Sequence, residues 1–168
     1  CWGDNSYGQA NVPALSSPTQ VDAGFEHVCA LDDTGVVCWG RSNEGKTTPP
    51  ALTNPIAVTA GKNHSCAIDD SGVVCWGDNA KKQTSVPAGI FNPTQIDSSL
   101  DHTCVVADSG VRCWGSRAQG RSTVPDGLVN PRQVTAGYGH SCALDDNGIT
   151  CWGTNANGRA TVPAGLVN

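Results

Sequence analysis

The fold of this chain of 168 residues can be inferred from one segment, Cys29-Ala-Leu-Asp-Asp-Thr-Gly-Val-Val-Cys38-Trp39-Gly40. Two apolar runs flank a turn of Asp, Thr and Gly, residues that tolerate turn conformations, so the stretch predicts a β-hairpin. With Asp33 and Thr34 at the centre of the turn, Cys29 lies opposite Cys38. Opposed residues of a hairpin have Cα atoms about 4.5–5.5 Å apart, a separation that a disulfide can bridge.

The Cys-Trp-Gly that closes this stretch occurs five times, starting at Cys1, Cys38, Cys75, Cys113 and Cys151, at intervals of 37, 37, 38 and 38 residues. Each interval contains a Val-Pro or Thr-Pro step, a second proline, a short β-rich run and a histidine two residues before a cysteine. Repeats of about 40 residues built from short strands are typical of propeller blades. We therefore predict an all-β propeller with about one four-stranded blade per repeat. The chain forms a single repeat domain over 1–168, with repeats at 1–37, 38–74, 75–112, 113–150 and, in part, 151–168.

The composition agrees with a β protein that is rich in turns. Aromatic residues make up 5% of the chain, methionine is absent, and there are 20 glycines and 10 prolines. No stretch has sustained helical periodicity or the length of an apolar membrane span, so we expect no membrane insertion. The net charge of -5 argues against nucleic acid as a partner, because phosphate binding needs a basic surface.

The nine cysteines follow the repeat, and their spacing favours disulfides over a zinc site. Hairpin pairing joins cysteines nine residues apart: Cys29 with Cys38, Cys66 with Cys75, Cys104 with Cys113, and Cys142 with Cys151. Pairing between successive repeats, from Cys1 to Cys29 and from Cys38 to Cys66, stays open. Disulfides indicate an oxidising location, so we expect a secreted or cell-surface protein. Hairpin pairing leaves Cys1 over as a candidate for an intermolecular bond.

The order Cys1-Trp-Gly-Asp-Asn-Ser-Tyr-Gly-Gln9, then Val12-Pro13, then Ala23-Gly-x-x-His-x-Cys-Ala-Leu31 resembles the regulator of chromosome condensation repeat. The short period and the Val-Pro step are most similar to the β-lactamase inhibitor protein II branch. The resemblance covers the whole chain and implies a seven-bladed propeller, of which four and a half repeats are present. A full ring at this period needs about 260 residues, so we expect part of a longer chain or a protomer completed by its neighbours.

Charged residues divide between the two ends of the expected blades. Acidic residues gather in the hairpin turns: Asp32, Asp33, Asp69, Asp70, Asp108, Asp145 and Asp146. Basic residues follow the Cys-Trp-Gly tripeptides: Arg41, Lys46, Lys81, Lys82, Arg117, Arg121 and Arg159. The sequence therefore predicts one acidic end and one more basic end.

The loops before the repeat histidines share the predicted basic end and differ from copy to copy, as recognition loops do. Exposed aromatic side chains in such loops would be natural interface anchors. The candidate partner-binding residues are Tyr7, Phe25, Glu26, Lys62, Asn63, Leu100, Asp101 and Tyr138.

No pattern in the chain indicates catalysis, a metal site or a cofactor. One tryptophan per repeat is typical of a core position between blades. The four histidines, one per blade, are too far apart to share a metal ion and indicate a repeated structural hydrogen bond. The Asp-Asp turns lack the ligand set of a calcium loop, and no nucleophile–base motif is present. We expect a protein that is not an enzyme.

These observations favour a non-catalytic extracellular scaffold that binds a protein or copies of itself, as a homo-oligomer or filament. Opposed charged ends would permit head-to-tail contacts, which form an open filament if they do not close. The resemblance implies an alternative, an inhibitor of a secreted enzyme that acts through the loops before the histidines. A guanine-nucleotide exchange module fits an acidic, disulfide-rich chain less well.

Overall fold

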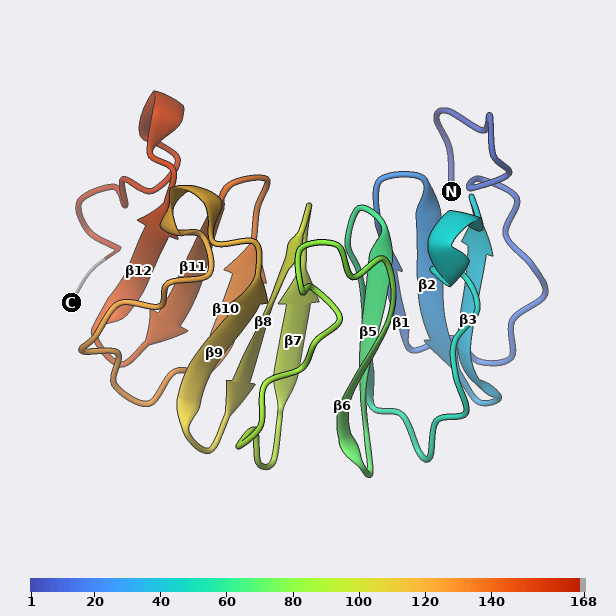
Figure 1. Ribbon diagram of the computed structural model, residues 1–168, viewed down its shortest axis with the longest axis horizontal. Coiled ribbons are helices and arrows are strands. Elements are labelled where there is room, and N and C mark those ends of the chain that lie inside the picture. The colour runs from blue at the N-terminus through green and yellow to red at the C-terminus, as the bar shows by residue number, and fades with distance from the viewer. Residues whose placement is uncertain (167–168) are drawn as a thin grey trace.

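Four antiparallel sheets of three consecutive strands each make up the computed structural model, which describes residues 1–166 (Figure 1). We call them blades 1 to 4. Blade 1 contains β1 (Gln20–Ala23), β2 (His27–Asp32) and β3 (Gly35–Gly40); blade 2 contains β4 (Ala57–Ala60), β5 (His64–Asp69) and β6 (Gly72–Gly77). Blade 3 contains β7 (Gln95–Ser98), β8 (His102–Ala107) and β9 (Gly110–Gly115); blade 4 contains β10 (Gln133–Ala136), β11 (His140–Asp145) and β12 (Gly148–Gly153). Short 3₁₀ helices follow three blades: η1 (Asn43–Gly45), η2 (Ala118–Gly120) and η3 (Ala156–Gly158).

The second and third strands of each blade form the predicted hairpin. In blade 1, Cys29 pairs with Cys38 and Asp32 pairs with Gly35, which leaves two residues as the turn. The carboxylate of Asp32 accepts hydrogen bonds from the backbone N–H of Thr34 at 2.8 Å and from its hydroxyl at 2.7 Å. Gly35 has a φ of 117°, which a residue without a Cβ adopts at little cost. The hairpin prediction is confirmed.

The prediction of four strands per blade is wrong for the described residues, because each sheet has three. The segments between successive sheets contain the proline steps Thr48-Pro49, Val86-Pro87 and Val124-Pro125; Val12-Pro13 precedes the first sheet and Val162-Pro163 follows the last. Proline has no N–H to donate to a ladder, which disfavours a fourth strand there. The segment contributes side chains instead: Val86 and Ile90 pack against the apolar cluster that includes Ile68 and Trp114.

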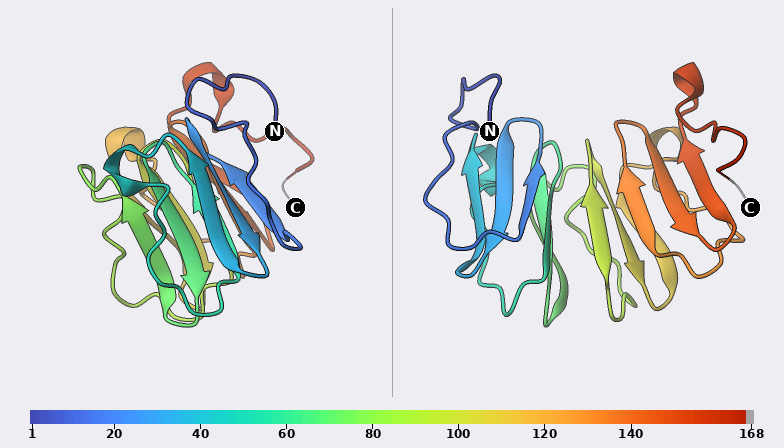
Figure 2. Two further views of the ribbon diagram at one scale, coloured as in Figure 1. Left: turned by 90° about the vertical axis from the view of Figure 1, so that its right-hand side faces the viewer. Right: turned by 180° about the vertical axis from the view of Figure 1, so that it is seen from behind.

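The blades stand side by side in a curved row, and blades 1 and 4 lie at its opposite ends (Figure 2). The first strands of neighbouring blades contact one another along the row. Gln20 of β1 reaches Val58 of β4, donating from Nε2 to its carbonyl and accepting from its N–H, both at 2.9 Å. The ring is not closed, in agreement with the predicted incomplete propeller.

Apolar side chains fill the contacts between neighbouring blades, which we call seams. Between blades 1 and 2, Leu31 packs with Val58 and Trp76. Trp76, Trp114 and Trp152 are only 7–8% exposed, as the prediction of a core position requires. Trp39 is half-buried, and Trp2 is 96% exposed, so the core prediction fails at Trp2.

The hairpin turns lie at the lower end of the blades in Figure 1, and the loops before the histidines lie at the upper end, which we call the loop end. Two of the basic residues predicted at the loop end do not lie at its surface. Lys46 is fully buried and Arg121 is 6% exposed. Acidic residues also share this end: Asp4, Glu26, Glu44, Asp78 and Asp101. Within residues 1–166, no helix has the length and apolar character needed to cross a membrane.

Candidate protein-binding surface

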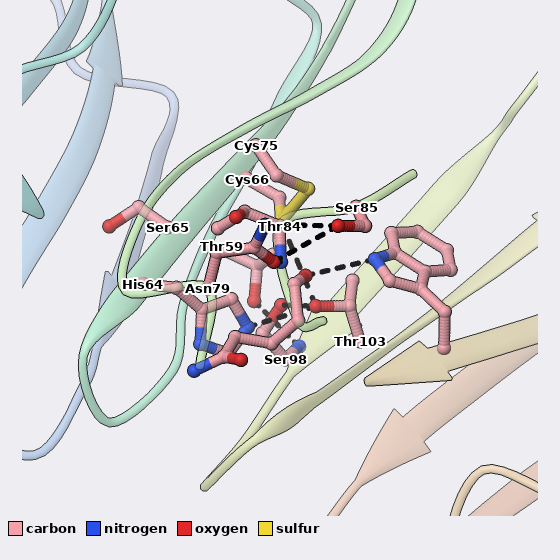
Figure 3. The surroundings of a disulfide bond; sticks show 12 residues. Thr59, His64, Ser65, Cys66, Cys75, Asn79, Thr84, Ser85, Ser98 and Thr103 are labelled. Atoms are coloured by element: carbon pink, nitrogen blue, oxygen red, sulfur yellow. Dashed lines mark hydrogen bonds between the residues drawn. A yellow bond between two sulfur atoms is a disulfide. The ribbon is translucent and has the colours of Figure 1, made fainter. Parts of the chain in front are cut away.

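A histidine of one blade contacts a hydroxyl of the next blade at each of the three seams. The distance is 2.9 Å for His27 Nε2 to Ser65 Oγ, His64 Nε2 to Thr103 Oγ1, and His102 Nε2 to Ser141 Oγ. Figure 3 shows the seam between blades 2 and 3, where Thr103 lies beside His64 and the Cys66–Cys75 disulfide. The structural role predicted for the histidines is confirmed at these seams.

The direction of the histidine bond between blades 1 and 2 follows from its neighbours. Ser65 Oγ donates to the carbonyl oxygen of Lys46 at 3.0 Å, so it accepts from His27 Nε2–H. Nδ1 of His27 is buried and has no hydrogen-bond partner among residues 1–166. Burial, with the nearby charge of Lys46, lowers the pKa of His27 to about 4; burial lowers the pKa of His64 to about 3 and of His102 to about 4. The imidazoles at the seams are therefore neutral at pH 7.

Each hairpin contains one disulfide: Cys29–Cys38, Cys66–Cys75, Cys104–Cys113 and Cys142–Cys151. Their Cα atoms are 4.0–4.1 Å apart, slightly closer than the separation predicted for directly opposed residues. Of the two connectivities considered, the structure has the one within hairpins. Cys1 is exposed and forms no disulfide within the described part of the chain.

The segment after each Cys-Trp-Gly is tied to the following blade. The carbonyl oxygen of Lys46, which accepts from Ser65, also accepts from Trp76 Nε1 at 2.9 Å. The same bond, at 2.9–3.0 Å, joins Trp39 to Gln9, Trp114 to Gln83, and Trp152 to Arg121. At the seams between blades 1 and 2 and between blades 3 and 4, the histidine, the serine hydroxyl, a backbone carbonyl and the tryptophan thus form one chain of donors and acceptors.

Two buried cations hold the loops before the histidines of blades 2 and 4. Lys46 Nζ donates to the carbonyl oxygen of Lys62 at 3.3 Å and to Asn63 Oδ1 at 3.0 Å. Arg121 Nη1 donates to the carbonyl oxygen of Tyr138 at 3.2 Å. Burial lowers the pKa of Lys46, because an ammonium group that is removed from water is less stable in its charged form. These loops are therefore positioned by charge-assisted hydrogen bonds from below.

The ends of the first strands of the four blades and the residues that follow them surround one hollow, which we call the groove. Its volume is about 370 Å³, and its lining includes the side chains of Asp22, Phe25, Lys62, Asp97, Leu100 and Tyr138. Phe25 and Tyr138 are 68% and 67% exposed. Lys62 Nζ lies 5.6 Å from the centroid of the Phe25 ring, a cation–π distance. Four of the eight sequence-predicted residues thus line one surface.

The other four predicted residues lie outside the groove. Tyr7 is 46% exposed, and its ring centroid is 4.6 Å from Arg41, whose guanidinium also bonds Glu26 at 2.8 Å. Asn63 is engaged by the buried Lys46, which leaves it less free to meet a partner. The backbone carbonyl of Asp101 accepts from Ser116 N–H at 2.8 Å.

Two aspartates of the groove were not among the sequence candidates. Asp22 Oδ2 accepts from Thr59 Oγ1 at 2.9 Å and from Ala60 N–H at 2.7 Å. Asp97 Oδ2 accepts from Thr135 Oγ1 at 3.0 Å and from Ala136 N–H at 2.7 Å. The available signal was a Gln-x-Asp pattern that recurs in alternate repeats, at 20–22 and 95–97.

Three solved structures place the fold among known proteins. The ectodomain of the receptor kinase CR4 from Physcomitrella patens is 27% identical, with a TM-score of 0.76, over 96% of this chain and 48% of that one. Prp20p from Saccharomyces cerevisiae is 18% identical, with a TM-score of 0.71, over 84% and 47%. The CRINKLY WD40 ectodomain of the Arabidopsis thaliana receptor kinase ACR4 is 24% identical, with a TM-score of 0.68, over 89% and 55%. The chain thus spans about half the length of these structures.

A family model provides the sequence-level match. The model for the regulator of chromosome condensation (RCC1) repeat matches residues 19–46, 56–83 and 132–159. Each matched segment begins at or just before the first strand of a blade and ends after its Cys-Trp-Gly. No curated protein sequence matches the chain. With three matched segments that together cover half of its residues, this chain belongs to the RCC1 repeat family.

Proposed function

We propose that this chain is a non-catalytic extracellular module that binds a protein through the loop end of its blades. The observation that carries the proposal is the convergence of one loop from each of four blades on the groove. Exposed aromatic side chains that are held in place are the usual anchors of protein interfaces. Phe25 contacts Lys62, and the Tyr138 backbone is fixed by buried Arg121, so little order would be lost on binding.

The extracellular part of the proposal is supported by the four disulfides, which persist in oxidising compartments. Similarity to the ectodomains of CR4 and ACR4 points the same way. The Prp20p structure was described together with the binding of that protein to Gsp1p and histones, an example of a related fold with protein partners.

The test is capture of proteins from extracellular medium by the immobilised chain, with variants matched for exposed apolar area. Phe25→Ala/Tyr138→Ala removes two anchors at the loop end. Phe91→Ala removes an equally exposed aromatic side chain, 67% accessible, whose backbone contacts Asp108 near a hairpin turn. The proposal expects specific capture by the wild type and by Phe91→Ala, and loss with the double variant. Capture that survives the double variant, or no specific capture at all, refutes it.

Inhibition of a secreted enzyme is the alternative that the β-lactamase inhibitor protein II resemblance implies, and it uses the same loops. It requires that the captured protein be an enzyme and that its turnover fall when the chain binds. Capture without any effect on turnover would exclude the inhibitor and leave the binding module.

Self-association is a second candidate, favoured by the open face of blade 4. His140 has no hydroxyl partner among the described residues, and Cys142 and Leu144 are half-buried where Cys66 and Ile68 are fully buried. Blade 1 has Val28 at the position where blades 2 to 4 have a serine or threonine. If blade 1 of a second copy packed against blade 4, it would therefore offer His140 no hydroxyl. Val28→Ser supplies the hydroxyl and should increase the dimer fraction in sedimentation equilibrium. No increase excludes this contact.

A further inference from the structure

We propose that the groove binds the side chain of a lysine or arginine presented by the protein partner. The inference rests on the proposed function and adds the chemistry of the partner. It is carried by the combination of apolar walls and two carboxylates in one hollow of about 370 Å³.

The walls suit the apolar stem of a long cationic side chain. Phe25 and Tyr138 present mostly exposed rings, and Leu100 and three alanines add further apolar atoms to the lining. Lysine and arginine pack their methylene groups on such surfaces while the charged group reaches further. The position of Lys62 Nζ over the Phe25 ring shows that an ammonium group is accommodated against this wall.

The two carboxylates supply the opposite charge. Thr59 Oγ1 lies 2.9 Å from an oxygen of Asp22 and 3.5 Å from one of Asp97, so the two groups are close neighbours. Within residues 1–166 the hydrogen-bond donors to both carboxylates are neutral, and neither carboxylate forms a salt bridge. Burial and the neighbouring Asp22 raise the pKa of Asp97, although its hydrogen bonds oppose the rise. A bound cation would offset both effects.

A single organic cation fits these groups better than a metal ion does. The described residues contain no cluster of three or more histidine, cysteine or carboxylate groups suited to a metal. A carboxylate has about four acceptor positions, and the donors of the chain occupy about three on each aspartate. An ammonium or guanidinium group can use the remaining positions without displacing the bonds between the blades.

The test uses small probes with the full chain, followed by NMR of its backbone amides. The cationic probe is N-acetyl-lysine amide, and the matched neutral probe is N-acetyl-norleucine amide, which keeps the stem and removes the charge. We expect the lysine probe to shift the amides of Gly24, Gly61 and Ala136 with a Kd of about 1 mM and the norleucine probe to bind at least tenfold more weakly. Equal binding of both probes, or no shifts at the groove, refutes the inference.

Variants separate this inference from the proposed function. Asp97→Asn and, separately, Asp22→Asn should each weaken the lysine probe about tenfold, and Phe91→Ala should not change it. Two positions are used because either aspartate also joins two blades; the dispersion of the amide spectrum shows which variant remains folded. If capture of a protein partner requires Phe25 and Tyr138 but tolerates both asparagine variants, the binding module stands and the cation site is wrong. If the lysine probe binds but no partner is captured, the proposed function fails and the cation site stands.

Discussion

Acidification should destabilise the chain well above the pH at which its carboxylates titrate, because three neutral histidines are buried at the seams. His27, His64 and His102 have pKa values of about 4, 3 and 4 in the folded chain. In the unfolded chain a histidine titrates near pH 6.5. Between these values the unfolded state binds protons that the folded state does not, so stability falls as the pH is lowered.

The magnitude follows from the width of this window. One pKa unit corresponds to about 1.4 kcal/mol. At pH 5 each buried histidine therefore lowers the free energy of unfolding by about 2 kcal/mol relative to neutral pH. Three such groups sum to about 6 kcal/mol, against a total stability of about 5–15 kcal/mol for an ordinary domain. Hydrogen bonds lower the pKa of Asp32. At Asp69 the hydrogen bonds outweigh the effect of burial and also lower the pKa. The stability that these two carboxylates contribute is therefore lost only below about pH 4.

The assay is urea unfolding with the disulfides intact, followed by fluorescence at a series of pH values. His102→Gln keeps a donor for Ser141 but does not titrate, so it should reduce the loss between pH 7 and pH 5 by about 2 kcal/mol. NMR titration of the imidazoles of the folded wild type provides an independent measurement. Parallel stability curves for wild type and variant, or imidazole pKa values near 6.5 in the folded state, would show that the buried histidines do not cause the loss of stability.

Two further changes test other contacts. Lys46→Met removes the donor to two oxygens, one on Lys62 and one on Asn63. It should lower the free energy of unfolding by about 1–3 kcal/mol. The control Lys81→Met, at an exposed position, should change this free energy little. An equal effect of both substitutions in urea unfolding would contradict the buried role. The double variant Cys104→Ser/Cys113→Ser should cost about 2–3 kcal/mol, because it opens one hairpin loop. Peptide mapping without reduction should find only hairpin-linked pairs, and a Cys38–Cys66 peptide would contradict the structure.

The parts of the fold that depend on residues close together in the sequence could be predicted. The turn at Asp33 and Thr34, the pairing of Cys29 with Cys38 and the position of the loop end all follow from one hairpin and its polarity. The exposed anchors Phe25 and Tyr138 could be named because their loops differ from copy to copy.

The parts that depend on the next blade could not be predicted. Lys46 looks like a surface residue in the sequence, and it is buried because carbonyl and amide oxygens of another blade surround its ammonium. Asp22 and Asp97 look like ordinary strand residues until the first strands of neighbouring blades are placed side by side. The missing fourth strand depends on whether a proline segment pairs or only packs, which its composition leaves open.

The residues of the first strand alternate between two patterns from blade to blade, and this limits how blades of this type can close into a ring. Blades 1 and 3 have glutamine and aspartate in the first strand, whereas blades 2 and 4 have threonine at the aspartate position, and the Gln–Asp strands bond forward to the threonine strands. Such an alternation closes without a fault only when the number of blades is even. A ring with an odd number must contain one place where two blades of the same kind meet. Two aspartate blades would bring like charges together there. Two threonine blades would lack the glutamine and aspartate bonds and keep only a hydroxyl bond such as the one that Thr59 Oγ1 accepts from Ser98 N–H at 2.8 Å. A ring with an odd number of such blades therefore has one weaker contact between neighbouring blades, and it should open first at that contact.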